Sequence, residues 1–177
     1  MLRRHVCLNA KPLLVAGALV FVLASSPASA DWQGTVWNSS VEQADKDFRV
    51  PHRPPTSAEI SNLSDAFGGG EIKFAFDYTT GDLAFHHGAL LFRDGKLHAI
   101  SMRLIESAHC DKLIGILRRI YGPPAKEQEG PRSSQRITWY DEKNHNQVYL
   151  GYEKYTSVDD YCYLRYEPFI VPAPGQL

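Results

Sequence analysis

The sequence predicts an α+β fold, a two-layer sandwich in which an antiparallel sheet carries helices on one face. Two observations predict it. Segments with apolar residues at helical spacing precede groups of three segments in which apolar and polar residues alternate. Turns rich in Gly, Pro, Asp and Asn separate these segments. Because the order helix, strand, strand, strand occurs twice, we also hypothesise a tandem helix-β-β-β repeat.

Two capping boxes open the helices predicted in the first half. Residues 39–42 and 56–59 both have the pattern S/T-x-x-E, in which the first side chain caps backbone N–H groups and the Glu bonds back to the first residue. Prolines within 51–55 end the first helix, and Gly68-Gly69-Gly70 ends the second. The apolar residues predicted to face inward are Val41, Ala44 and Phe48 in the first helix, and Ile60, Leu63 and Phe67 in the second.

Three strands are predicted after these helices. Residues 71–78 alternate as in a half-buried strand. Its predicted apolar face comprises Ile72, Phe74, Phe76 and Tyr78. Two further strands over 83–92 and 97–105 join at Asp94-Gly95, a pair that favours a two-residue hairpin turn because both positions need positive φ.

The second half repeats this order. Residues 107–121 predict an amphipathic helix that ends at Gly122-Pro123-Pro124. A polar loop over 125–135 follows. Three strands are then predicted over 136–141, 146–153 and 161–167.

The N-terminal segment has the order of a secretory signal peptide. Basic residues precede an apolar run over 13–24, and Ala28-Ser29-Ala30 forms a small-residue exit. A membrane span needs about 20 apolar residues, so we expect cleavage of residues 1–30 and no membrane span afterwards; an uncleaved anchor is the alternative. Residues 31–167 are predicted to form a single α+β domain and residues 168–177 a Pro-rich tail. The expected location is the periplasm or the exterior.

The charge of the mature chain bears on its partners. Three of the 19 basic residues and none of the 20 acidic residues lie in residues 1–30, which leaves 16 basic against 20 acidic residues and a formal charge of −4. A nucleic-acid or anionic-membrane binder would need a basic stripe instead. We therefore expect no nucleic-acid partner.

Two cysteines remain after cleavage removes Cys7. In an oxidising compartment, Cys110 and Cys162 are the only intramolecular pair that can form a disulfide. Both are predicted to point into the layer between helix and sheet. The alternative is a nucleophilic Cys110 beside His109.

A candidate binding face is predicted from the tyrosines, seven of which lie at or beyond position 140. Strand alternation places Tyr161, Tyr163 and Arg165 on the face opposite Cys162, and Tyr149 on one face of the preceding strand. If these faces coincide, the four residues form an aromatic and cationic patch, which Arg136 and Tyr140 would extend. Tyr and Arg are the residue types enriched at interface hot spots. The alternative is that they only form cross-strand pairs on a solvated sheet face.

Four histidines within 24 residues offer a second hypothesis: His86, His87, His98 and His109. Neighbouring strand residues point to opposite faces, so His86 and His87 reach one site only if a bulge re-aims one of them. Only one of the pair can meet His98 across the hairpin. Nucleophile-elbow, zincin, Walker and dinucleotide-binding motifs are absent from the sequence, and we predict no cofactor, metal or catalytic residue.

Three segments resemble a group of small exported, periplasmic bacterial proteins: residues 31–37 (DWQGTVW), 92–97 (FRDGKL) and 117–124, which end in YGPP. These motifs are structural, so the resemblance implies an address and a fold but no site residues. The element order is also similar in outline to the modules of beta-lactamase-inhibitor proteins and outer-membrane-assembly lipoproteins, which bind other proteins. The lipoprotein cysteine is missing here.

Our leading expectation is a disulfide-containing periplasmic binding or inhibitor module that grips a protein or envelope component with its open sheet face. The alternatives are a small histidine-dependent hydrolase or metal-binding enzyme, and a purely structural envelope factor.

Overall fold

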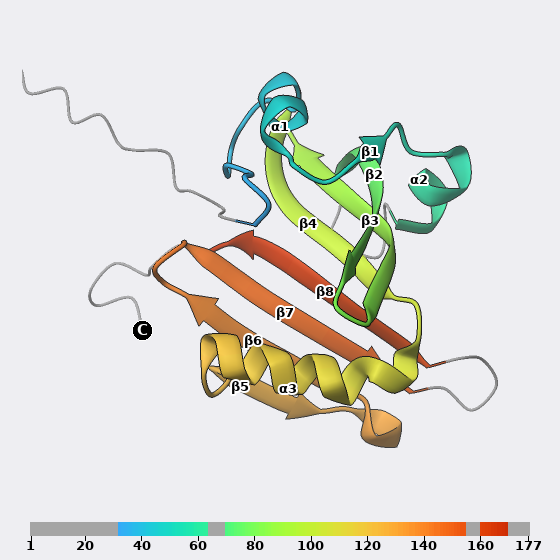
Figure 1. Ribbon diagram of the computed structural model, residues 1–177, viewed down its shortest axis with the longest axis vertical. Coiled ribbons are helices and arrows are strands. Elements are labelled where there is room, and N and C mark those ends of the chain that lie inside the picture. The colour runs from blue at the N-terminus through green and yellow to red at the C-terminus, as the bar shows by residue number, and fades with distance from the viewer. Residues whose placement is uncertain (1–31, 64–69, 155–159, 170–177) are drawn as a thin grey trace, which may run out of the picture.

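The computed structural model describes residues 32–63, 70–154 and 160–169 (Figure 1). The predicted signal peptide and most of the predicted tail lie outside the described residues. The described chain is an α+β fold, mostly an eight-stranded antiparallel sheet with a few short helices. The helices are α1 (Val41–Asp47), α2 (Ser57–Leu63) and α3 (Cys110–Tyr121), with 3₁₀ turns at Ser107–His109 and Pro131–Ser133. The strands are β1 (His52–Arg53), β2 (Glu71–Thr80), β3 (Leu83–Arg93), β4 (Lys96–Leu104), β5 (Lys126–Glu129), β6 (Gln135–Asp141), β7 (Asn146–Glu153) and β8 (Tyr161–Pro168).

The two groups of strands meet through their last members. The strand order is β1-β2-β3-β4-β8-β7-β6-β5, so β4 pairs with β8 in the middle of the sheet, and β1 and β5 form its edges. Figure 1 shows the first group in green, with α1 above it, and the second in orange and red, with α3 lying along it. We call residues 32–104 the first half and residues 107–168 the second half. No helix in the described ranges is long and apolar enough to cross a membrane.

The long strands agree with those predicted, each within two residues at either end. The predicted turn between β3 and β4 is confirmed, because Asp94 and Gly95 have φ of 50° and 71°. Sequence alternation did not predict β1 and β5. All four residues of β5, Lys-Glu-Gln-Glu, are exposed, and an edge strand without an apolar face carries no alternation to detect.

The capping box before α2 is confirmed. The Thr56 hydroxyl accepts a hydrogen bond from the Glu59 N–H at 3.2 Å, and the Glu59 carboxylate accepts one from the Thr56 N–H at 2.8 Å. Helix α1 begins one residue later than its box predicts, with Ser40 as the cap. The prediction that Ile60 faces inward is wrong, since 46% of it is exposed. Phe67 lies outside the described residues.

A large apolar core lies between the sheet and the helices α1 and α3. Trp37 and Trp139 are its largest buried side chains. The Trp37 indole N–H donates to the Asn146 side-chain oxygen at 2.9 Å, and that of Trp139 donates to the Gly122 carbonyl at 3.1 Å. Each ring therefore buries its apolar area without leaving its N–H group unpaired.

A second, smaller apolar cluster lies on the other face of the sheet and comprises Ile72, Ala89, Leu91 and Ala99. The prediction that Ile72 shares a face with Phe74 and Phe76 is wrong. The β2–β3 register shifts between Ile72 and Phe74, and this bulge turns Ile72 to the opposite side.

Helix α2 departs from the expectation that all helices lie on one face. Its Glu59 binds Arg53 through two hydrogen bonds of 2.8 and 2.7 Å. Arg53 pairs with Ala75 and Ala75 with Ala89, a member of the smaller cluster, so Arg53 faces the side away from the large core.

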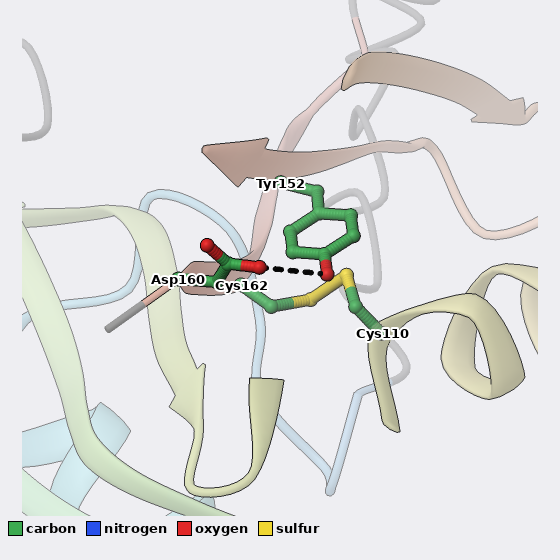
Figure 2. Close-up of a disulfide and its surroundings, with 4 residues drawn as sticks. All are labelled: Cys110, Tyr152, Asp160 and Cys162. Carbon is green, nitrogen blue, oxygen red and sulfur yellow. Dashed lines mark hydrogen bonds between the residues drawn. A yellow bond between two sulfur atoms is a disulfide. The ribbon is translucent and has the colours of Figure 1, made fainter. Parts of the chain in front are cut away.

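The predicted disulfide between Cys110 and Cys162 is confirmed (Figure 2). It joins the first residue of α3 to β8, and both cysteines are fully buried. Beside it, the Tyr152 hydroxyl donates a hydrogen bond to the Asp160 carboxylate at 3.2 Å (Figure 2). The bond closes 52 residues of chain, so the helix and the strands of the second half form one covalent ring.

Candidate binding face of the sheet

The strand register builds a continuous row of side chains across five strands on the face opposite α3. The row runs Arg136, Gly151, Tyr163, Arg103, His86. Residues paired across antiparallel strands point to the same side of a sheet. The predicted coincidence of the β6, β7 and β8 faces is therefore what the register shows, and the row continues across β4 into β3.

Three tyrosines form the centre of this face, and we call Tyr149, Tyr161 and Tyr163 the tyrosine patch. The Tyr163 ring lies 5.8 Å from the Tyr149 ring and 5.5 Å from the Tyr161 ring, between centroids. The Tyr163 hydroxyl also donates to that of Tyr149 at 3.4 Å. A Cβ at Gly151 would come within 2.4 Å of the Tyr163 ring, so the glycine leaves room for the ring to lie across β7.

The Tyr163 hydroxyl stays protonated at physiological pH. Burial raises its pKa, and the hydrogen bond to Tyr149 raises it further. The Tyr163 hydroxyl is therefore a neutral hydrogen-bonding group at the centre of the patch.

Arg103 joins the patch, although the sequence analysis did not select it. Its guanidinium carbon lies 4.1 Å from the centre of the Tyr161 ring, a cation–π contact. Its Nε is buried and has no hydrogen-bond partner among the described residues. Alternation along β4 is the signal that could have identified it, since Arg103 follows Ser101 on the face opposite Met102 and Leu104.

His86 and His87 are brought together by a bulge. The β3–β4 register shifts between His86 and Ala89, and His87 adopts a φ of 49°. The two imidazole rings lie 4.2 Å apart. Burial lowers the pKa of His86, and the charges of His87 and Arg103 lower it further, so His86 is neutral at pH 7. Its Nε2 is also buried without a hydrogen-bond partner in the described part of the chain.

The other histidines lie elsewhere. His86 pairs with Arg103, whereas His98 lies at the opposite end of the β3–β4 hairpin, next to Gly70. His98 and Arg103 are five positions apart along β4, which is about 16 Å at the rise of a strand. His109 belongs to the 3₁₀ turn before α3. Within the described ranges, no group of three or more His, Cys, Asp or Glu residues could hold a metal ion.

Of the remaining predicted site residues, Arg136 is exposed, whereas Arg165 and Tyr140 already have partners within the protein. Arg136 is exposed and pairs with Glu153 at 3.3 Å. Arg165 lies on the predicted face but is 8% exposed and bound to Glu167 at 2.7 Å. Tyr140 stacks on Phe169, with ring centroids 4.4 Å apart. Arg165 is therefore buried beneath the face, whereas Tyr140 is half-buried and has one ring face covered by Phe169.

Comparison with known protein families, with curated proteins and with solved structures finds no match to this chain.

Proposed function

We propose that this protein is a binding or inhibitor module whose partner, a protein or envelope component, docks on the tyrosine patch. The observation that carries the proposal is the pair of orphaned nitrogen atoms beside the patch, Arg103 Nε and His86 Nε2. Buried polar groups are nearly always hydrogen-bonded, and an unpaired one costs about 1–3 kcal/mol. A partner that supplies an acceptor to the Arg103 Nε–H group, and to His86 Nε2 a donor or an acceptor according to the imidazole tautomer, would remove that cost.

The partner chemistry follows from the two kinds of group on the face. The guanidinium of Arg103 selects a carboxylate or another anionic oxygen group, which binds it through charge-assisted hydrogen bonds. The rings of Tyr149 and Tyr163 select an apolar or aromatic group that can cover them. An acidic side chain next to an aromatic or aliphatic one meets both requirements.

A crosslinked pull-down from the native envelope tests the proposal, with the unaltered protein beside a Tyr149→Ala/Tyr163→Ala variant and an Arg103→Met variant. We expect a partner that the unaltered protein captures and that both variants lose. Tyr140→Ala is the matched control, because it removes a tyrosine of the same sheet face that is stacked on Phe169. Equal capture by all four proteins, at equal thermal stability, would rule out the patch as the binding surface.

The second candidate is the small histidine-dependent hydrolase or metal-binding enzyme. The 4.2 Å approach of the His86 and His87 rings favours it, because the bulge supplies the re-aiming that a shared site requires. Its test is a hydrolase screen and a metal analysis of the unaltered protein and of His87→Ala. An activity or bound metal that the variant loses supports this candidate, and a blank result for the unaltered protein removes it.

We further propose export to the periplasm or exterior with cleavage after Ala30. The disulfide supports an oxidising location. The intact mass of the protein purified from its host tests both the cleavage and the disulfide. Cleavage removes the mass of residues 1–30, and reduction of the disulfide adds two hydrogens. Free thiols or an uncleaved N-terminus would contradict export to the periplasm or exterior.

A finer account of the fold is also a proposal: a two-layer sandwich built from a tandem helix-β-β-β repeat. The strand order supports it, because exchanging β1–β4 with β5–β8 gives the same order read from the opposite edge of the sheet. Helix α2, bound to Arg53 on the other face, is an addition to the first unit under this scheme.

A further inference from the structure

A cavity of about 430 Å³ lies on the side of the sheet that carries α3, opposite the tyrosine patch. Its walls are mostly aromatic and aliphatic side chains. Helix α3 contributes Leu113, Ile116, Ile120 and Tyr121, and the rest of the wall includes Trp32 and Tyr166. This volume falls within the roughly 300–1,000 Å³ of small-molecule sites in proteins.

One wall of the cavity follows α3. Its lining residues on this helix run from Leu113 to Tyr121, eight steps along the helix, or about 12 Å at the rise of an α-helix. At the outer edge, Ile120 is 63% exposed, although a helix normally buries such a residue on its apolar stripe. The apolar wall therefore continues from the interior to the surface.

The inner wall offers few polar atoms, and that of Tyr78 is already paired. The Tyr78 hydroxyl accepts a hydrogen bond from the Gln33 amide at 3.0 Å. The orphaned atoms Arg103 Nε and His86 Nε2 lie on the other face. A sugar or nucleotide would lose its hydration without gaining partners here, whereas a hydrocarbon chain loses nothing.

Charge is confined to one end of the cavity. Asp82 lines that end and forms an exposed ion pair with Lys112, next to Leu113 at the start of the helical wall. A carboxylate placed there would compete with Asp82 for the Lys112 ammonium group. Among the described residues that line the cavity only Asp82 is charged, and Lys112 lies beside the lining through its ion pair with Asp82.

We propose that this cavity binds one fatty acid of medium chain length, with its alkyl chain along α3 and its carboxylate at Lys112. The inference is independent of the proposed function, because the two sites occupy opposite faces of the sheet.

Calorimetric titration of the purified, oxidised protein with decanoate tests the proposal. We expect saturable binding of one decanoate per chain. Ile116→Trp should fill the cavity and weaken binding at least tenfold, while Ile105→Trp, at an exposed isoleucine outside the cavity, should leave it unchanged. Circular dichroism of both variants checks that the fold is retained. Absence of saturable binding, or equal loss in both variants, would overturn the proposal.

An Asp82→Asn variant tests the contribution of the ligand's carboxylate separately from that of its alkyl chain. Because the amide no longer neutralises Lys112, decanoate should bind several-fold more tightly to this variant, and decan-1-ol should bind as it does to the unaltered protein. Equal strengthening for acid and alcohol would refute the placement of the carboxylate. A concentration-dependent dimer that decanoate does not dissociate would show that a second copy fills the cavity instead.

Quenching of tryptophan fluorescence by a bromine-tagged decanoic acid locates the bound ligand independently. Trp32 lines the cavity and stacks on Tyr166, with ring centroids 5.6 Å apart. The bromine should quench part of the tryptophan emission, and Trp32→Phe should remove that part while keeping the calorimetric binding. Quenching that persists in Trp32→Phe would place the ligand elsewhere.

Discussion

The two halves of the sheet differ in the regularity of their strand pairing. In the second half, β6 pairs with β7 and β7 with β8 in unbroken register. In the first half, the β2–β3 and β3–β4 ladders each contain two register shifts. Side chains of the second half therefore follow simple alternation, and bulges in the first half turn particular residues to the other face. The regular half carries most of the tyrosine patch, and the irregular half adds His86 and Arg103.

The Cys110–Cys162 disulfide lies within the second half alone. Its removal should have the largest effect on the free energy of unfolding. For a Cys110→Ala/Cys162→Ala variant we expect a loss of about 4 kcal/mol in the free energy of unfolding, since the unfolded chain regains the entropy of a 52-residue loop. Urea unfolding measures this loss, and reduction of the unaltered protein is the control. Hydrogen exchange should rise more in β6–β8 than in β2–β3. A loss below about 1 kcal/mol would show that packing alone holds this half.

A matched pair of glycines compares the halves directly, because each lies under an aromatic ring of the neighbouring strand. In the first half, a Cβ at Gly88 would come within 2.6 Å of the Phe76 backbone oxygen and 2.4 Å of its buried ring. In the second half, the three atoms nearest to a Cβ at Gly151 would all belong to the Tyr163 side chain. We expect Gly88→Ala to cost about 2–3 kcal/mol and Gly151→Ala about 1 kcal/mol, because only the tyrosine ring can swing away. Urea unfolding of both variants measures the difference, and equal costs would contradict it.

The smallest expected effect concerns the acid sensitivity of the first half. The hydrogen bonds from Arg53 hold the pKa of Glu59 at about 2, with a further contribution from Thr56. A lowered folded-state pKa stabilises the fold above the ordinary pKa near 4.5, and this stability is lost as pH falls toward 2. Since half of the Arg53 side chain is exposed, we expect Glu59→Gln to cost only about 1 kcal/mol at pH 7. Urea unfolding at pH 7 and pH 3 should show the gap between variant and unaltered protein narrowing in acid. If the difference in unfolding free energy were the same at both pH values, the loss would come from the helix cap and not from the ion pair.

The same contrast explains which parts of the fold the sequence could predict. Alternation located the six long strands, because each buries one face, and it placed Tyr149, Tyr161 and Tyr163 together where the register is unbroken. It misplaced Ile72, because a bulge is a property of the paired strands and leaves no mark in one strand's pattern. The edge strand β5 has no buried face, so it had no pattern to detect.

The candidate sites were predictable only to the extent that they depend on strand faces. The sequence located the tyrosine patch but not Arg103, whose importance arises from its stacking on Tyr161 and from its buried Nε. It included Arg165 and Tyr140, whose partners Glu167 and Phe169 become apparent only in three dimensions. The cavity beside α3 gave no signal, because its walls come from both halves of the chain and a void between packed elements has no sequence pattern.

The Cys110–Cys162 bond also governs how the molecule responds to a protease. An exposed segment open to cleavage lies inside the covalent ring, around Arg132 and Ser133, two exposed residues with positive φ. A cut there yields two fragments that remain one molecule, because the disulfide still connects them. The nicked protein would migrate as an intact chain until it is reduced, and β6 to β8 would keep the part of their alignment that the bond imposes. Hydrolysis of a peptide bond and loss of the assembled sheet are thus separate events in the second half.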